Sequence, residues 1–214
     1  EPVGQASALQ VRRRIGYLPE NVALWDNLSG LETLKFFARL KGLDTAGCAA
    51  LLTKVGLEHA GDRPVRAYSK GMRQRLGFAQ ALQGNPQVLF LDEPTSGLDP
   101  QLDRDVMELL ATLAHGTRPG DTGRTVMVVT HNENHIDRAD KVLILASGGR
   151  PVYFGSPRQV IPYFRERLAE LRAAGQLVVS APRGGFPDPG QIEGFADVYA
   201  LIRNHTQVLR AHLE

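Results

Sequence analysis

The sequence predicts an α/β fold in which helices flank a parallel β-sheet. Short apolar runs alternate along the chain with segments of helical periodicity, an order typical of parallel strands joined by right-handed crossovers. The apolar runs are Ile15–Leu18, Val88–Leu91, Thr125–Thr130 and Val142–Ala146. Val88–Leu91 shows no alternation of apolar and polar residues, so we expect it to be a strand buried on both faces. We expect Thr125–Thr130 to be a second buried strand.

The composition is that of an ordinary globular protein. The 214 residues are 43% hydrophobic and 22% charged, enough for one well-buried core with an appendage. The formal charge of +2 provides no strong basic field, so no nucleic-acid partner is expected. The single cysteine, Cys48, allows no internal disulfide, which suits a reducing compartment. No apolar run is long enough for a membrane helix, so any membrane contact is expected through another subunit or segment.

Helical segments fill the first half of the chain between the predicted strands. A short helix is expected over Ala6–Arg14, and Ser29 with Glu32 forms the capping box of the next, which stops at Lys41 and Gly42. A weaker helix follows at about Thr45–Val55. Together with the chain through residue 85, these segments predict a helical subdomain, about residues 22–85, inserted before the strand at Val88.

The remaining helices follow from caps and stop signals. Ser69 caps a helix of about Lys70–Gln83, and Gln101–His115 is amphipathic. Ser156 and Pro157 begin a helix in the last sixty residues. A loop at Ala181–Gln191 and a helix at Phe195–Leu213 complete the chain. We expect one domain over residues 1–154 and a C-terminal helical extension over 155–214.

Two carboxylates, Asp92 and Glu93, follow the strand Val88–Leu91 directly. The carboxyl ends of parallel strands are where open α/β sheets hold their ligands. Two adjacent acids at such an edge can have different roles, one in binding a metal ion and one in activating a water molecule. Asp92 can reach Mg²⁺, directly or through its water, and Glu93 can orient and deprotonate an attacking water.

The stretch VLFLDEPTSGLDP resembles the Walker B motif and D-loop of ABC-type ATPases, with Asp99 in the D-loop. The stretch YSKGMRQR resembles the ABC signature motif, with Lys70 and Met72 in place of the usual glycine and glutamine. A serine hydroxyl and free backbone N–H groups at a helix start suit a phosphate, so the resemblance assigns ATP contacts to Ser69, Lys70, Gly71 and Met72. The implied fold is a partial P-loop NTPase (RecA-like) parallel sheet with an inserted helical subdomain.

Two further residues take roles from this resemblance. His131 follows the strand Thr125–Thr130, where the matching family histidine contacts the γ-phosphate and the region of the catalytic water. Glu20, in YLPEN, stands where most ABC proteins carry the Q-loop glutamine that touches Mg²⁺. A glutamate still offers an oxygen to the metal, but it adds a negative charge and loses the amide donor.

The phosphate-binding motif G-x-x-x-x-G-K-[ST] does not occur in the sequence. The resemblance covers Gly16 to about Phe154, so we expect an upstream segment of roughly 50 to 80 residues that carries this loop and an adenine-stacking aromatic. These 214 residues alone are then expected to be neither a competent ATPase nor a tight ATP binder.

The resemblance implies an ATP-hydrolysing, Mg²⁺-dependent subunit or domain of an ABC transporter, closest in its motifs to ABC-2 exporters and subfamily G half-transporters. Its expected partners are a transmembrane permease and a second nucleotide-binding domain in a head-to-tail dimer, at the cytoplasmic face of a membrane. Two alternatives stay open: a non-transport ABC ATPase, and a catalytically inactive ABC-like module that binds a partner. The cargo cannot be inferred, since membrane segments choose it in this family.

Overall fold

The computed structural model describes residues 8–116, 123–175 and 188–210. The predicted helix ends at Ala6 and at Leu213, and most of the predicted loop Ala181–Gln191, lie outside the described residues. Contacts within the chain define two units, residues 1–131 and 132–214, which are described separately. This division falls before the predicted boundary at residue 154, which remains a prediction about domains.

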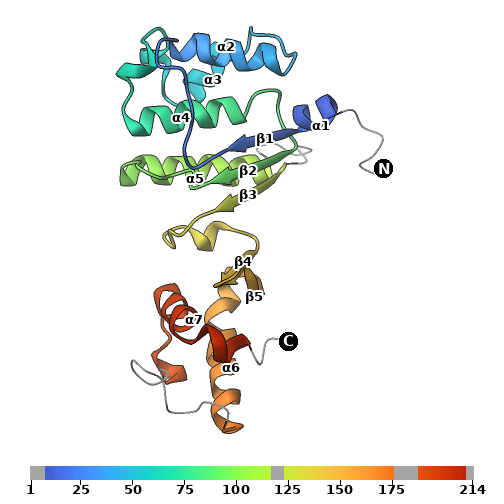
Figure 1. Cartoon of the computed structure of the whole chain (residues 1–214), viewed down its shortest axis with the longest axis vertical. Helices are drawn as coiled ribbons and strands as arrows, with labels where there is room; N and C mark the ends of the chain where they lie inside the picture. The colour runs from blue at the N-terminus through green and yellow to red at the C-terminus, as the bar shows by residue number, and fades with distance from the viewer. Residues whose placement is uncertain (1–7, 117–122, 176–187, 211–214) are drawn as a thin grey trace. The chain divides into compact units, whose positions relative to one another are not determined.

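The first unit contains a parallel sheet of three strands, in the order β1-β2-β3 (Figure 1). They are β1 (Ile15–Leu18), β2 (Val88–Asp92) and β3 (Thr125–Val129). Leu18 pairs with Leu91, and Asp92 pairs with Val129. The predicted parallel α/β arrangement is therefore confirmed for these three strands.

One face of this sheet carries the core of the first unit. Leu18, Leu89 and Leu91 are buried against apolar side chains of α4 (Lys70–Ala81) and α5 (Pro100–His115). The opposite face is open, since Tyr17, Phe90 and Met127 are aligned across the strands and are 56%, 36% and 51% exposed. The prediction that Val88–Leu91 is buried on both faces is therefore wrong, and so is the prediction that Thr125–Thr130 is a buried strand, because the described helices pack on one face only.

The helices α2 (Gly30–Leu40) and α3 (Cys48–Lys54) lie between β1 and β2, within the predicted helical subdomain, with two 3₁₀ turns at Glu58–Ala60 and Val65–Ala67. The predicted capping box is present: Ser29 Oγ accepts from the Glu32 N–H at 3.2 Å, and Glu32 Oε2 accepts from the Ser29 N–H at 2.8 Å. A short helix, α1 (Ala8–Arg14), leads into β1.

The second unit is built on an antiparallel hairpin of β4 (Val142–Ala146) and β5 (Arg150–Gly155). The sequence led us to expect Val142–Ala146 as a further strand of the parallel sheet, and that expectation is wrong. Gly148 and Gly149 both have positive φ, at 83° and 73°, a conformation in which glycine lets the chain reverse and pair β4 with β5 directly.

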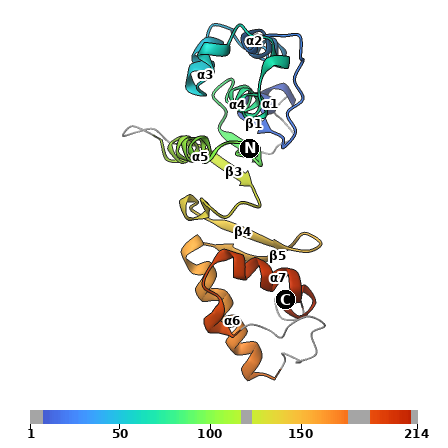
Figure 2. The same cartoon turned by 90° about the vertical axis from the view of Figure 1, so that its left-hand side faces the viewer.

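Two helices, α6 (Val160–Ala173) and α7 (Phe195–Arg210), pack with the hairpin around a second core that includes Phe164, Leu168 and Leu201 (Figure 2). Short 3₁₀ turns lie at Ile136–Arg138, Pro157–Gln159 and Pro189–Gln191. Within the described residues of both units, every helix is too short or too polar to cross a bilayer.

Candidate functional site

Four of the residues predicted to carry chemistry lie at the carboxyl edge of the β1-β2-β3 sheet: Glu20, Asp92, Glu93 and His131. Glu93 follows β2 directly, and its N–H donates to the carbonyl oxygen of Val129, the last residue of β3, at 2.8 Å. His131 lies two residues beyond that strand end, and Glu20 lies two residues beyond the end of β1. Parallel pairing thus gathers residues that are far apart in the sequence at one edge.

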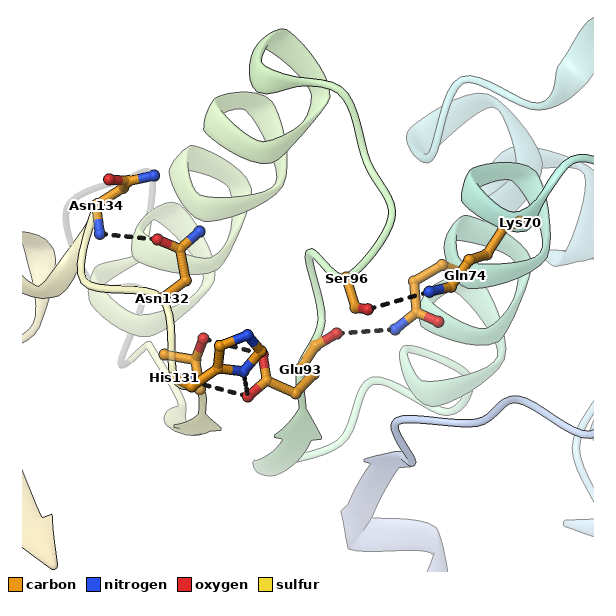
Figure 3. A network of polar contacts seen from close by, with 8 residues as sticks. Lys70, Gln74, Glu93, Ser96, His131, Asn132 and Asn134 are labelled. Carbon is orange, nitrogen blue, oxygen red and sulfur yellow. Dashed lines mark hydrogen bonds and ion pairs between the residues drawn. The ribbon is translucent and has the colours of Figure 1, made fainter. Parts of the chain in front are cut away.

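The Glu93 carboxylate is held by the two residues that follow β3 (Figure 3). Oε1 accepts from the His131 backbone N–H at 2.8 Å and lies 2.7 Å from His131 Nδ1. Oε2 accepts from the Thr130 hydroxyl at 3.1 Å. The Glu93 side chain is 13% exposed, whereas the His131 side chain is 87% exposed. A carboxylate here is oriented by three donors and still reached by solvent.

The lone pairs of this carboxylate show which oxygen can take a proton. An ionised carboxylate accepts at about four lone-pair positions, two on each oxygen. Oε1 already accepts two donors, whereas Oε2 accepts one among the described residues. One lone pair of Oε2 therefore remains for a water molecule.

The backbone of Glu93 has a positive φ of 47°. For a residue with a Cβ, such a conformation costs on the order of 1–3 kcal/mol and persists only where surrounding contacts enforce it. Those contacts are present, since the Glu93 carbonyl oxygen accepts from Gln74 Nε2 and from the Ser96 N–H, both at 3.1 Å. Hydrogen bonds therefore hold both the N–H group and the carbonyl group of Glu93, on either side of its Cα.

Asp92 and Glu20 provide the carboxylates predicted to reach a metal ion. Asp92 is half-buried at the end of β2, and Glu20 is exposed. The described residues contain no group of three or more His, Cys, Asp or Glu side chains that could hold a metal ion. One or two carboxylates fit Mg²⁺, which keeps several waters and takes further oxygens from phosphates.

The signature segment begins α4, and its serine acts as the N-cap. Ser69 Oγ accepts from the Met72 N–H at 3.2 Å. Lys70 lies over the turn that follows Glu93, with Nζ 3.4 Å from Ser96 Oγ. A Cβ added to Gly71 would lie 3.2 Å from Leu98 Cδ2. The start of α4 and the segment Ser96–Leu98 are therefore in direct contact within one chain.

Asp99 has a local structural role. Its Oδ1 accepts from the Gln101 and Leu102 N–H groups, both at 3.0 Å, and so caps α5. The side chain is exposed, and its assignment as an ATP contact remains a prediction.

Sequence reasoning did not assign a role to Thr130 or Gln74, although both side chains bond to Glu93. Thr130 stood out only as the last residue of the predicted strand, directly before His131. Gln74 is a buried polar residue on a helix face otherwise occupied by Gly77, Phe78 and Ala81, a pattern that can indicate a specific hydrogen bond.

Comparison with known proteins places these motifs in a family. A family model described as "ABC transporter" matches residues 1–96. The "Fluoroquinolones export ATP-binding protein Rv2688c" of Mycobacterium tuberculosis is 36% identical over 90% of this chain and 61% of its own length. Over these stretches the chain is similar to ABC transporter ATP-binding proteins.

Other ABC relatives match over a smaller share of their length. The "ABC transporter ATP-binding/permease protein Rv1747" of M. tuberculosis is 38% identical over 97% of this chain and 26% of its own length. The "Nod factor export ATP-binding protein I" of Cupriavidus metallidurans is 36% identical over 75% of this chain and 52% of its own length. The chain thus spans about a quarter to three fifths of these three relatives.

Proposed function

We propose that this chain is part of the ATP-hydrolysing machinery of an ABC transporter, and that the transporter is an exporter. The observation that carries the proposal is the Glu93 carboxylate, which three donors orient at the sheet edge while part of it stays open to solvent. Two of the ABC relatives are named as export proteins, which supports the direction of transport.

In this proposal Glu93 is the general base. A carboxylate with a free lone pair on Oε2 can accept a proton from a water that attacks the γ-phosphate of ATP. His131 donates through its backbone and Nδ1 to Oε1, so the proton from the proposed water would go to the less occupied Oε2. The protein thus orients both the base and the proton transfer.

The remaining predicted residues bind and orient the nucleotide. Asp92 and Glu20 would hold Mg²⁺, with Glu20 in place of the usual glutamine. Mg²⁺ bound with ATP would neutralise charge on the phosphate oxygens. Ser69, Lys70 and Gly71, with Met72 and Asp99, would contact nucleotide that is held by a second ATP-binding domain in a head-to-tail dimer.

The proposed location follows from the proposed partners. ATP-driven closure of the dimer would drive a transmembrane permease, so the chain would lie at the cytoplasmic face of a membrane. The names of two relatives, one "ATP-binding/permease" and one "export ATP-binding", support a membrane partner.

The variant Glu93→Gln tests this function in the ATPase-active assembly that contains the chain. Glutamine keeps the shape of the side chain but is a poor base, so ATP binding should persist while kcat falls by roughly 10²–10⁴-fold. The matched control is Glu58→Gln, which changes an exposed glutamate in the helical subdomain and should leave kcat unchanged. Wild-type turnover in Glu93→Gln would assign the base to another residue, with His131 next.

A further inference from the structure

The side-chain amide of Gln74 connects helix α4 to the backbone of Glu93. Gln74 is 4% exposed, and its Nε2 donates to the Glu93 carbonyl oxygen at 3.1 Å. Figure 3 shows Gln74 reaching the carbonyl on one side of Glu93, while the carboxylate extends to His131 on the other side. The two ends of Glu93 are therefore bound to different elements.

Burial of Gln74 requires a specific partner. A buried amide without hydrogen bonds is destabilising, and glutamine is seldom fully buried for that reason. Most other buried positions of α4 are apolar or small, including Leu76, Phe78 and Ala79. The bond to Glu93 explains why a polar side chain occupies this position.

The conformation of Glu93 depends on such bonds. Its φ of 47° is unfavourable for a residue with a Cβ, and φ sets the direction in which the Cα–Cβ bond points. Two of the main-chain bonds come from backbone groups, the sheet bond to Val129 and the turn bond from Ser96. The third comes from the Gln74 side chain and can be removed without a change in backbone.

We propose that Gln74 is a positioning residue that holds the Glu93 backbone in the conformation from which its carboxylate acts. Gln74 lies five residues after the N-cap Ser69 on the same helix, so a displacement of the start of α4 is transmitted to Glu93 through this bond. This inference rests on the proposed function of Glu93 as general base.

The test compares two buried glutamines in ATPase-active assemblies that contain the chain. Gln74→Met removes the amide, and loss of orientation should lower kcat by roughly 10- to 100-fold, with KM for ATP nearly unchanged. Gln83→Met is the matched control, because Gln83 is 2% exposed and its Nε2 also donates to a backbone carbonyl, that of Leu34, at 2.6 Å. It should lower the unfolding temperature similarly but leave kcat within about twofold.

Combination with Glu93→Gln separates this inference from the proposed function. If Gln74 acts through the base, then Gln74→Met should cause no further loss in kcat once Glu93 is replaced. A full additional loss in the double variant would overturn the positioning role. If Gln74→Met does not fold, Gln74→Ala replaces it, since the shorter side chain also removes the amide and adds neither bulk nor charge.

The experiments give different results if the base assignment of Glu93 is wrong and if the positioning role of Gln74 is wrong. Slow turnover by Glu93→Gln together with wild-type turnover by folded Gln74→Met overturns the positioning role and leaves the base assignment intact. Wild-type turnover by Glu93→Gln overturns the base assignment and the positioning role with it. A selective loss of kcat in both variants, absent in Gln83→Met, supports both.

Discussion

His131 contacts the Glu93 carboxylate twice, through its backbone N–H at 2.8 Å and its ring Nδ1 at 2.7 Å, both to Oε1. An ionised carboxylate only accepts hydrogen bonds, so Nδ1 must carry a proton in this pair. The ring then reaches solvent through Nε2, since the side chain is 87% exposed. In this geometry His131 can orient the proposed base with one nitrogen and face a phosphate with the other.

Removal of the His131 ring should reduce ATP turnover less than removal of the base. In His131→Ala the backbone N–H still binds Oε1, so we expect kcat to fall by roughly 10- to 100-fold, against a larger loss for Glu93→Gln. Steady-state kinetics of both variants measure the difference. His59→Ala, at an exposed position in the helical subdomain, should be as active as wild type. A loss in His131→Ala larger than in Glu93→Gln would make His131 the principal catalytic residue.

Gly71→Asp tests the assignment of the signature segment to a neighbouring nucleotide. The substitution places a negative charge where a γ-phosphate is proposed to dock. When both ATP-binding domains of the ATPase-active assembly carry it, kcat should fall by roughly 10²-fold or more. Gly71→Ala is the control: its Cβ would meet Leu98 Cδ2 at 3.2 Å, so it reports the steric part without the charge.

Mixed dimers of Gly71→Asp with wild type then decide whether the contact is made in trans. One composite site should fail and the other should remain, so single-turnover measurements should show about half of the sites active. Full activity at both sites of the mixed dimer would contradict the trans assignment.

The 214 residues by themselves should bind Mg-ATP weakly. The G-x-x-x-x-G-K-[ST] motif, whose backbone amides and lysine bind the phosphates, does not occur in the sequence. We expect isothermal titration calorimetry to give a Kd weaker than about 1 mM, corresponding to less than about 4 kcal/mol of binding free energy. Circular dichroism should first establish that the purified chain is folded. Micromolar binding with a defined stoichiometry would contradict this prediction.

The capping box of α2 should contribute a pH-dependent part of the stability. The Ser29 backbone N–H, followed by the Ser29 side chain, lowers the pKa of Glu32 below its ordinary value of 4.5. The ionised form is therefore favoured in the folded state, and its contribution is present above pH 4.5 and is lost as the pH falls through the lowered pKa.

Urea unfolding of wild type and Glu32→Ala at several pH values measures this contribution. Wild type should have the higher midpoint at pH 7, and the difference should shrink as the pH falls below 4.5 and through the lowered pKa of Glu32. Arg39→Ala, at an exposed position on the same helix, serves as a comparison for the loss of a long side chain without loss of the cap. A pH-independent difference between wild type and Glu32→Ala would contradict the role of the carboxylate charge.

Local sequence patterns were sufficient to predict the starts of several helices. Ser29 with Glu32 and Ser69 with Met72 form the expected cap bonds, because these depend on groups within three residues of one another. The order of the apolar runs was likewise enough to predict three parallel strands. It also placed Glu93 and His131 at the same sheet edge, since carboxyl ends of parallel strands meet there.

Only the tertiary structure decided the burial of the strands and the surroundings of Glu93. An apolar run cannot show which of its faces a helix will cover, so the exposure of Phe90 and the antiparallel pairing of Val142–Ala146 were not predicted. The bond from Gln74 to the Glu93 carbonyl joins residues 19 positions apart and depends on how α4 packs beside β2. The sequence by itself determined which residues could carry the chemistry, because residue type and local spacing set the motifs. Tertiary packing determined which groups orient them, because hydrogen bonds between distant segments exist only once the chain is folded.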